Sequence, residues 1–204
     1  GLSMLLALSF IIVFSFSVLF LLYVILGNLL GWYYAAPPVR LAYRGLGEIA
    51  TMVIFGLMVP GLGYLVLMGK FTIGFMIFVL PFMLYGLALI IAVQIPDMES
   101  DYLGNKNTLI VRKGRRFGFL VIGFLLSLAT FCFLILSLIN LLPAVIDFRL
   151  IGLLSFLPLS FGIQGLLKQP TERTPATKLV TNTLSFTLLF VFMINCYFLL
   201  LLNY

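Results

Sequence analysis

Long stretches without a single charged residue dominate this sequence. Residues 1–39 carry no charge, and further uncharged runs cover 49–69, 71–96, 117–146, 150–167 and 179–204. A helix that crosses a membrane needs about 20 consecutive apolar residues, so each run is close to or above that length. The runs are apolar on every face, whereas strands of a membrane barrel alternate apolar and polar residues. The sequence therefore predicts an all-α integral membrane protein.

The composition excludes several other classes of protein. Hydrophobic residues make up 63% of the chain and charged residues 9%, whereas soluble domains average about 45–50% and ~25%. This excludes a soluble enzyme and a disordered chain. The net charge of +6 would suit a nucleic-acid binder, but basic loops beside membrane helices give the same excess, so no nucleic-acid partner is expected. Since the chain has no His, its chemistry must depend on carboxylates and cations.

The first 39 residues are too long for one span. As one helix they would measure about 58 Å, about twice the hydrocarbon thickness of a bilayer. We therefore expect a hairpin with spans over 2–13 and 18–34 and a turn near Ser15 and Ser17. Together with the five later runs this gives a transmembrane bundle of about seven helices in a single domain, 1–204.

The basic residues indicate how this bundle lies in the membrane. If the spans alternate in direction, the segments 35–48, 97–116 and 168–178 lie on one side and contain all 12 Lys and Arg except Lys70 and Arg149. By the positive-inside rule this side faces the cytoplasm. The expected location is the cell membrane, multi-pass, with these loops cytoplasmic. The same rule accounts for most of the basic run at 112–116 without any further role.

The second of these segments contains half of the six acidic residues, Asp97, Glu99 and Asp101. Asp97 and Asp101 are four residues apart, so a helix through both would place their carboxylates on one face, about 6 Å apart along its axis. Mg²⁺ favours carboxylate and phosphate oxygens, and Lys106 and Arg112 could meet the remaining phosphate charge. The alternative is that these acids form ion pairs with neighbouring basic residues. A transporter site is less compatible, because such sites lie near mid-bilayer.

These residues resemble a family. The pattern D-x-E-x-D, followed by Gly, Lys, Thr-Leu and Val-Arg-x-Gly, resembles the second aspartate-rich motif of the UbiA superfamily of intramembrane prenyltransferases. The segment 34–48, Y-A-A-P-P-V-R-L-A-Y-R-G-L-G-E, resembles its Tyr- and Pro-containing loop. The part Y-R-G-L-G-E is most similar to the MenA-like branch, which prenylates 1,4-dihydroxy-2-naphthoate in menaquinone biosynthesis. The resemblance covers the chain as the third to ninth helices of a nine-helix fold.

The resemblance also implies a missing part. The first aspartate-rich motif of the superfamily, N-D-x-x-D, is not in this sequence, where no Asp or Glu precedes Glu48. Because the family holds diphosphate through Mg²⁺ between both motifs, we expect the sequence to be an N-terminally truncated form of a longer protein. The alternative is a catalytically inactive membrane scaffold.

The activity that the resemblance implies is transfer of an isoprenyl group from isoprenyl diphosphate to an aromatic acceptor, in a lipid bilayer, with Mg²⁺ assisting departure of the diphosphate. Asp97 and Asp101 would bind Mg²⁺, with Glu99 as a third oxygen ligand. Lys106 and Arg112 would bind the diphosphate.

The loop before the second long span contributes the other implied site residues. Arg40 and Arg44 would bind either the diphosphate or a carboxylate of the acceptor, and Tyr34 would face the carbocation or the acceptor. Glu48 has two interpretations, as a cap on the positive N-terminus of the helix it opens or as part of the site.

Four positions depart from the family pattern, and one of them is Ala35, which replaces the small hydroxyl residue often found after the Tyr. Asn105 stands where Gly is usual, and since Asn tolerates a left-handed backbone we expect the turn to be retained. Gln94 and Pro96 replace the Asn and Arg that MenA-like members commonly place before the first Asp. The acceptor therefore stays open, with 4-hydroxybenzoate, homogentisate and an isoprenyl glycerol phosphate as alternatives.

Overall fold

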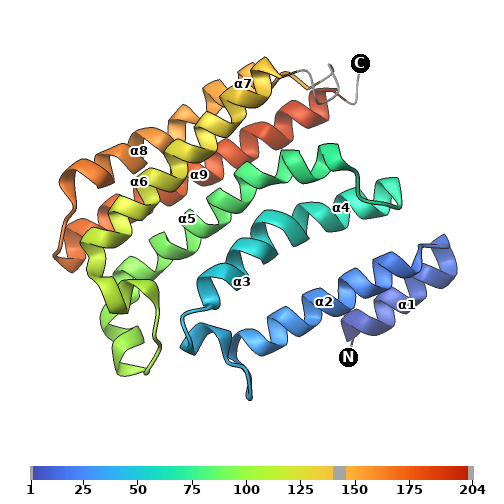
Figure 1. The fold of residues 1–204 in the computed structure, drawn as a ribbon, viewed down its shortest axis with the longest axis horizontal. Helices are drawn as coiled ribbons and strands as arrows, with labels where there is room; N and C mark the ends of the chain where they lie inside the picture. The colour runs from blue at the N-terminus through green and yellow to red at the C-terminus, as the bar shows by residue number, and fades with distance from the viewer. Residues whose placement is uncertain (1, 140–145, 202–204) are drawn as a thin grey trace.

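The protein is helical throughout the part that its computed structural model describes, residues 2–139 and 146–201 (Figure 1). The elements in chain order are α1 (Leu2–Phe14), α2 (Val18–Ala35), the short 3-10 turn η1 (Leu41–Tyr43), α3 (Gly47–Val53), the π-helical η2 (Ile54–Met58), α4 (Val59–Met68), α5 (Ile73–Leu103), α6 (Leu109–Leu138), α7 (Phe148–Leu154), α8 (Phe156–Lys168) and α9 (Arg173–Leu201).

Six helical segments in the described residues are long and apolar enough to cross a membrane. They are Val18–Ala35, Gly47–Met68, Ile73–Leu103, Leu109–Leu138, Phe148–Lys168 and Arg173–Leu201. The predicted hairpin at the start is confirmed, with its turn at Ser15, where φ is 54°. Its first helix, α1, has 13 residues and so measures about 20 Å, which is shorter than the hydrocarbon core. The ends of two predicted runs, at 140–145 and 202–204, lie outside the described residues.

The largest core lies between α5, α6, α8 and α9. Ile95, Leu126, Phe133 and Phe190 are fully buried there. Because lipid tails are as apolar as these side chains, membrane helices associate through close packing and polar contacts. Gly123 and Gly162 allow α6 and α8 to approach closely, since a Cβ at Gly162 would lie 2.8 Å from a side-chain carbon of Leu126. This part of the molecule is a tightly packed bundle.

The α1–α2 hairpin packs much more loosely. Figure 1 shows the two helices as a pair beside α4, at the edge of the molecule away from α6 and α8. Only Ala7 of α1 and Phe20 of α2 are buried, together with Leu65 of α4. Most of the hairpin surface is therefore available to lipid or to other partners within the membrane.

Two predicted loops are wrong in extent. The segment 97–116 is helical except at 104–108 and at the kink at Gly114, and the segment 168–178 is helical except at 169–172. The charges ended the apolar pattern, but they did not end the helices, because a helix can continue into the interfacial region where charged side chains are solvated. The Thr108 hydroxyl accepts from the Val111 N–H (3.3 Å) and so caps the start of α6.

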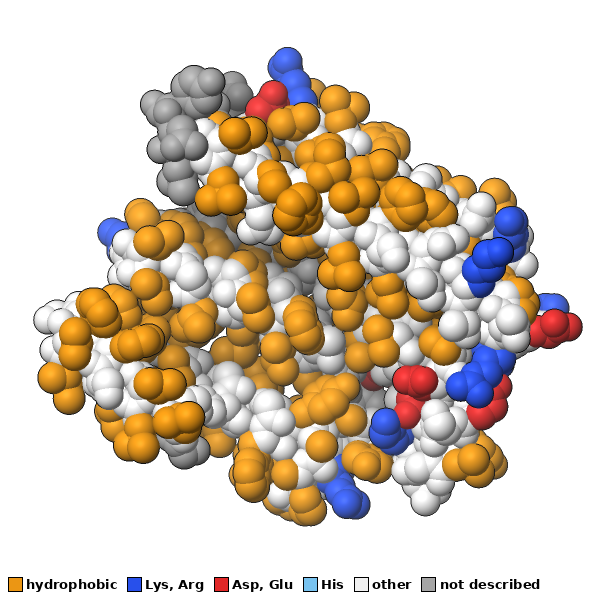
Figure 2. Space-filling view, turned by 180° about the vertical axis from the view of Figure 1, so that it is seen from behind, with side chains coloured by type: hydrophobic (Ala, Val, Ile, Leu, Met, Phe, Trp, Pro, Cys, Tyr) orange, Lys and Arg blue, Asp and Glu red, His pale blue; other side chains and the backbone are white. Residues whose placement is uncertain are grey.

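The three basic segments nevertheless meet at one end of the bundle, as the alternating topology predicts. The Asn107 N–H donates to the Tyr43 carbonyl (3.3 Å), which joins the α5–α6 and α2–α3 connections. Arg115 donates to the Thr171 carbonyl (3.2 Å), which adds the α8–α9 connection. Figure 2 shows most of the blue and red side chains toward the right and lower right, a few others at the top and left, and hydrophobic side chains over most of the remaining face. We call this end of the bundle the charged end.

Candidate active site

A cavity of about 350 Å³ lies at the charged end. Its walls come from the last turn of α2, from η1 and the start of α3, from the last turns of α5, and from the α5–α6 connection. It is lined by Tyr34, Ala35, Ala42, Tyr43, Gly47, Ile90, Val93, Gln94, Asp97, Asp101, Lys106 and Thr108. The cavity thus contains two carboxylates and an amine toward the end of α5, and it contains the apolar side chains of Ile90 and Val93 one to two turns earlier on the same helix. We call it the polar cavity.

One face of α5 supplies most of the polar groups. Gln94, Asp97 and Asp101 have the spacing i, i+3 and i+7, so in a helix of 3.6 residues per turn they lie above one another on one face. Helix α5 continues through both aspartates, which is the condition for this shared face, although Pro96 lies between Gln94 and Asp97. The three side chains span about 10 Å along the axis, from the apolar part of the cavity to its charged part.

Asp101 and Lys106 form an ion pair in this cavity. Lys106 Nζ lies 2.7 Å from Asp101 Oδ1, and the side chains are 40% and 8% exposed. The hydrogen bond to Asp101 and the charge of that carboxylate raise the pKa of the Lys106 amine above its usual value. The turn between them is retained as predicted, with Asn105 left-handed at φ 55°.

The simple ion-pair interpretation of the acidic motif therefore holds for Asp101 but not for Asp97. In the described part of the chain the carboxylate of Asp97 has no hydrogen-bond or ion-pair partner. It lies beside the polar cavity one helical turn from Asp101. A cation or ligand in the cavity would therefore meet one carboxylate that is already paired, Asp101, and one that is unpaired, Asp97.

Glu99 does not reach the polar cavity. It is two positions from Asp97, which turns its side chain about 200° around the helix. There it accepts from Arg115 (Nη2 to Oε2, 2.6 Å). Within the described residues no group of three acidic or Cys side chains could hold a metal ion. The expectation that Glu99 is a third ligand is therefore corrected.

Three predicted substrate-binding arginines also lie outside the lining. Arg40 places its guanidinium 5.0 Å from the centre of the Tyr43 ring, and Arg44 donates to the Pro38 carbonyl (3.0 Å). Arg112 lies beside Gly45, where an added Cβ would be 3.1 Å from its Nη2. All three are exposed at the charged end. Of the predicted site residues, the structure brings Tyr34, Asp97, Asp101 and Lys106 together.

Arg115 is a structural residue that the sequence did not single out. It is buried, and it donates to the Ile95 carbonyl (3.1 Å), the Thr171 carbonyl (3.2 Å) and Glu99. Gly114 precedes it with φ 79°, a conformation that favours glycine, and α6 is kinked at this residue. Arg115 thereby ties α5, α6 and the α8–α9 connection together.

Glu48 has a third role that neither interpretation gave. Its Oε1 accepts from the Leu109 N–H (2.6 Å), so this buried carboxylate caps the N-terminus of α6 and not of its own helix. The first N–H groups of a helix lack partners and carry partial positive charge, which explains the contact. Glu48 thereby fixes the α5–α6 connection, including Lys106, against α3.

The comparison with family models decides the identity. The model of the UbiA prenyltransferase family matches residues 2–191, which includes every residue of the polar cavity. The chain belongs to the UbiA prenyltransferase family. No curated protein and no solved structure matches it. Members of this family are membrane prenyltransferases that act on isoprenyl diphosphate and aromatic substrates, in agreement with the multi-pass helical fold.

The polar cavity of this UbiA-family chain suits a hard cation bound to phosphate. Its candidate ligands are all oxygens, from the carboxylates of Asp97 and Asp101, while both Cys residues lie elsewhere, in α6 and α9. Mg²⁺ is commonly held by one or two carboxylates and completes its shell with water and phosphate oxygens. Lys106 adds a cation that can pair with a phosphate. The residues present therefore fit Mg²⁺ and a diphosphate.

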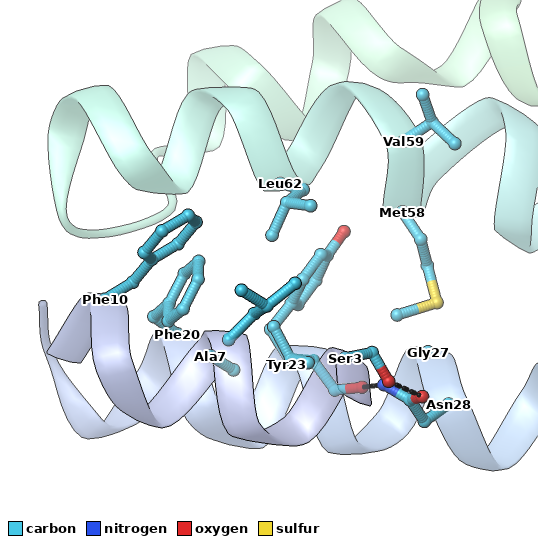
Figure 3. Close-up of a pocket in the computed structure, with 12 residues that line it drawn as sticks. Ser3, Ala7, Phe10, Phe20, Tyr23, Gly27, Asn28, Met58, Val59 and Leu62 are labelled. Atoms are coloured by element: carbon cyan, nitrogen blue, oxygen red, sulfur yellow. Dashed lines mark hydrogen bonds between the residues drawn. The ribbon is translucent and has the colours of Figure 1, made fainter. Parts of the chain in front are cut away.

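A second cavity, of about 400 Å³, lies between α1, α2 and the η2–α4 segment (Figure 3). Its walls are almost entirely apolar, with Phe10 and Phe20 from the hairpin facing Leu62 (Figure 3). The Tyr23 hydroxyl reaches across it to donate to the Leu57 carbonyl (3.0 Å). We call this the apolar cavity. It offers no charged group to a diphosphate.

Proposed function

We propose that this chain transfers an isoprenyl group from isoprenyl diphosphate to a hydroxylated aromatic acceptor. The observation that carries the proposal is the convergence of Asp97, Asp101 and Lys106 on one cavity that the apolar side chains of Ile90 and Val93 also line. A diphosphate needs cations and metal-binding carboxylates, and an isoprenyl group needs an apolar, water-poor surface. The polar cavity supplies both kinds of surface.

The ionisation step assigns a role to each of these side chains. Asp97 and Asp101 would hold Mg²⁺, which when bound neutralises charge on the diphosphate. The amine of Lys106 moves from Asp101 to a phosphate oxygen as that charge develops. Stabilising charge where it accumulates on the leaving group lowers the barrier to breaking the C1–O bond.

The carbon–carbon bond forms on the apolar side. As the C1–O bond breaks, its electron pair leaves with the diphosphate and C1 becomes an allylic cation. Tyr34 presents an aromatic ring beside this position, and a ring face attracts a cation. The acceptor ring carbon then bonds to C1 and loses its proton. Ile90 and Val93 help to exclude water, which would otherwise capture the cation.

The first acceptor to test is 1,4-dihydroxy-2-naphthoate, because the segment 34–48 resembles the MenA-like branch. The assay measures transfer in lipid with and without Mg²⁺, with 4-hydroxybenzoate, homogentisate and an isoprenyl glycerol phosphate as competing acceptors. It uses the 204-residue chain and the same chain joined to a hairpin bearing N-D-x-x-D. Since two carboxylates alone hold the diphosphate from one side, we expect rapid transfer only with the added motif.

The outcomes separate the possibilities. Transfer to the naphthoate supports the MenA-like assignment, and transfer to another acceptor changes the acceptor but keeps the enzyme. Equal rates with and without the added motif would contradict the expectation that rapid transfer needs that motif. If neither form transfers to any acceptor, the chain is an inactive scaffold and the proposed function is wrong.

We further propose that the charged end faces the cytoplasm in the cell membrane, because ten of the 12 Lys and Arg lie in its three segments. The test is labelling of single cysteines in intact cells with an impermeant reagent, after Cys132 and Cys196 are changed to Ala. A cysteine at Lys70, at the opposite end, should label from outside, and one at Lys113 should not. Labelling of the Lys113→Cys variant and not of the Lys70→Cys variant would show that the protein has the opposite orientation.

A further inference from the structure

Gln94 is a buried polar side chain of the polar cavity that has no role in the proposed release of diphosphate. The residue is 6% exposed and lines the cavity, and its Oε1 has no hydrogen-bond partner in the part of the chain that the structure describes. A buried polar atom without a partner is costly and uncommon in native proteins. Its place in a ligand cavity indicates that a ligand supplies the partner.

The position of Gln94 indicates which part of a ligand it meets. It lies one turn of α5 before Asp97, about 4.5 Å along the axis toward the apolar side of the cavity. A diphosphate at Asp97 and Lys106 would place the reacting C1 of the isoprenyl group at the level of this amide. An acceptor that bonds to C1 must lie beside this level, so Gln94 is placed to meet the second molecule of the reaction.

The chemistry of the amide narrows that molecule further. Gln94 is neutral, so it adds no charge for a diphosphate, which the cations already meet. The end of a Gln side chain turns easily and can present either its oxygen or its nitrogen. A hydroxyl group can pair with both, because it donates to the oxygen or accepts from the nitrogen, whereas a carboxylate can only accept.

We propose, on the basis of the proposed function, that Gln94 binds a ring hydroxyl of the aromatic acceptor and so selects acceptors that carry one. A hydroxyl that donates to the amide oxygen keeps its own electron pairs available to the ring, and this makes the neighbouring ring carbon nucleophilic. That carbon bonds to C1 while the C1–O electron pair leaves with the diphosphate. The proton displaced from the ring carbon passes to a diphosphate oxygen, and Gln94 is unchanged.

The binding test uses two probes that differ in one methyl group, 4-hydroxybenzoate and 4-methoxybenzoate, with the 204-residue chain in lipid nanodiscs. Equilibrium dialysis should show that the wild type binds the hydroxylated probe about five- to tenfold more tightly, as one neutral hydrogen bond allows. Gln94→Met, which keeps the volume, should bind both probes equally. Gln94→Glu, which can still accept from a hydroxyl, should keep the preference.

A stability measurement distinguishes recognition from a structural role. Because the amide has no protein partner, Gln94→Met should melt at the wild-type temperature or above it. The matched control is Gln164→Met on α8, which makes the same change outside the cavity and should leave the probe preference intact. Melting of Gln94→Met several degrees lower would overturn the proposal, as would equal binding of both probes by the wild type.

Kinetics separates this inference from the proposed function. In whichever form of the chain transfers the isoprenyl group, with or without the added hairpin, Gln94→Met should raise the KM for the acceptor about five- to tenfold. It should leave the KM for isoprenyl diphosphate within twofold. If transfer continues with an unchanged acceptor KM, the assignment of Gln94 is wrong and the proposed function stands. If the wild type transfers to no acceptor, the proposed function itself fails.

Discussion

The polar and the apolar cavity lie in the same chain and are similar in volume, about 350 and 400 Å³, but they are built in different ways. The polar cavity is held by contacts between distant segments, such as Glu48 with Leu109 and Asn107 with Tyr43. The apolar cavity is bounded by a hairpin that buries only one residue from each of its helices. The charged groups are positioned by hydrogen bonds between distant segments, whereas the apolar cavity is bounded by loosely packed helices.

The largest expected difference between the two cavities is in turnover. Asp97→Asn and Asp101→Asn should each lower transfer at least about 100-fold, because loss of a charged ligand removes several kcal/mol of transition-state stabilisation. The matched control is Glu99→Gln, the same chemical change on the same helix, which should stay within about twofold. Steady-state rates in lipid with Mg²⁺ give the result. Near-normal turnover of either Asn variant would remove that aspartate from the site.

The network around the polar cavity should be sensitive to loss of Arg115. Arg115→Met leaves the Thr171 carbonyl and Glu99 without their donor, and since Glu99 is half exposed we expect a loss of about 1–3 kcal/mol in unfolding free energy. Arg116→Met, at the exposed neighbouring position, should change it by less than about 0.5 kcal/mol. Denaturant or thermal unfolding in detergent measures both. Equal stability of the two variants would contradict the tie between the segments.

Substitutions in the apolar cavity should have the smallest effects on transfer and stability. Tyr23→Phe removes the hydrogen bond to the Leu57 carbonyl and should lower stability by about 0.5–1.5 kcal/mol while leaving transfer within twofold. Tyr102→Phe, an exposed change at the charged end, is the control for stability. A tenfold loss of transfer in Tyr23→Phe would show that the reaction depends on the apolar cavity and would break the contrast.

The parts of the fold that the sequence predicted are those that depend on local pattern. A backbone in lipid must satisfy its own hydrogen bonds, so uncharged runs become helices, and the turn at Ser15 follows from bilayer thickness. The four-residue spacing of Asp97 and Asp101 likewise places them on one face as soon as the helix continues. The left-handed Asn105 follows from its tolerance of that conformation.

The parts that it did not predict depend on packing between distant segments. Glu48 and Leu109 are 61 positions apart, and Arg115 and Glu99 are 16 apart, so no local spacing brings either pair together. Glu99 was assigned with its neighbours by motif, although its position on the helix turns it away from them. The unpaired amide of Gln94 becomes visible only when the cavity wall is complete. In the sequence, only the departure of Gln94 from the family pattern pointed to this residue.

The central claim is that the polar cavity holds an isoprenyl diphosphate through Asp97, Asp101 and Lys106. The most direct measurement is the affinity of a non-ionising analogue, geranylgeranyl thiolodiphosphate, for the chain in nanodiscs as Mg²⁺ is varied. Mg²⁺ should tighten binding about tenfold or more in the wild type and in Glu99→Gln, but not in Asp97→Asn or Asp101→Asn. Lys106→Met should weaken binding at every Mg²⁺ concentration. Binding that is independent of Mg²⁺ in the wild type, or equal in wild type and all three cavity variants, would contradict the claim.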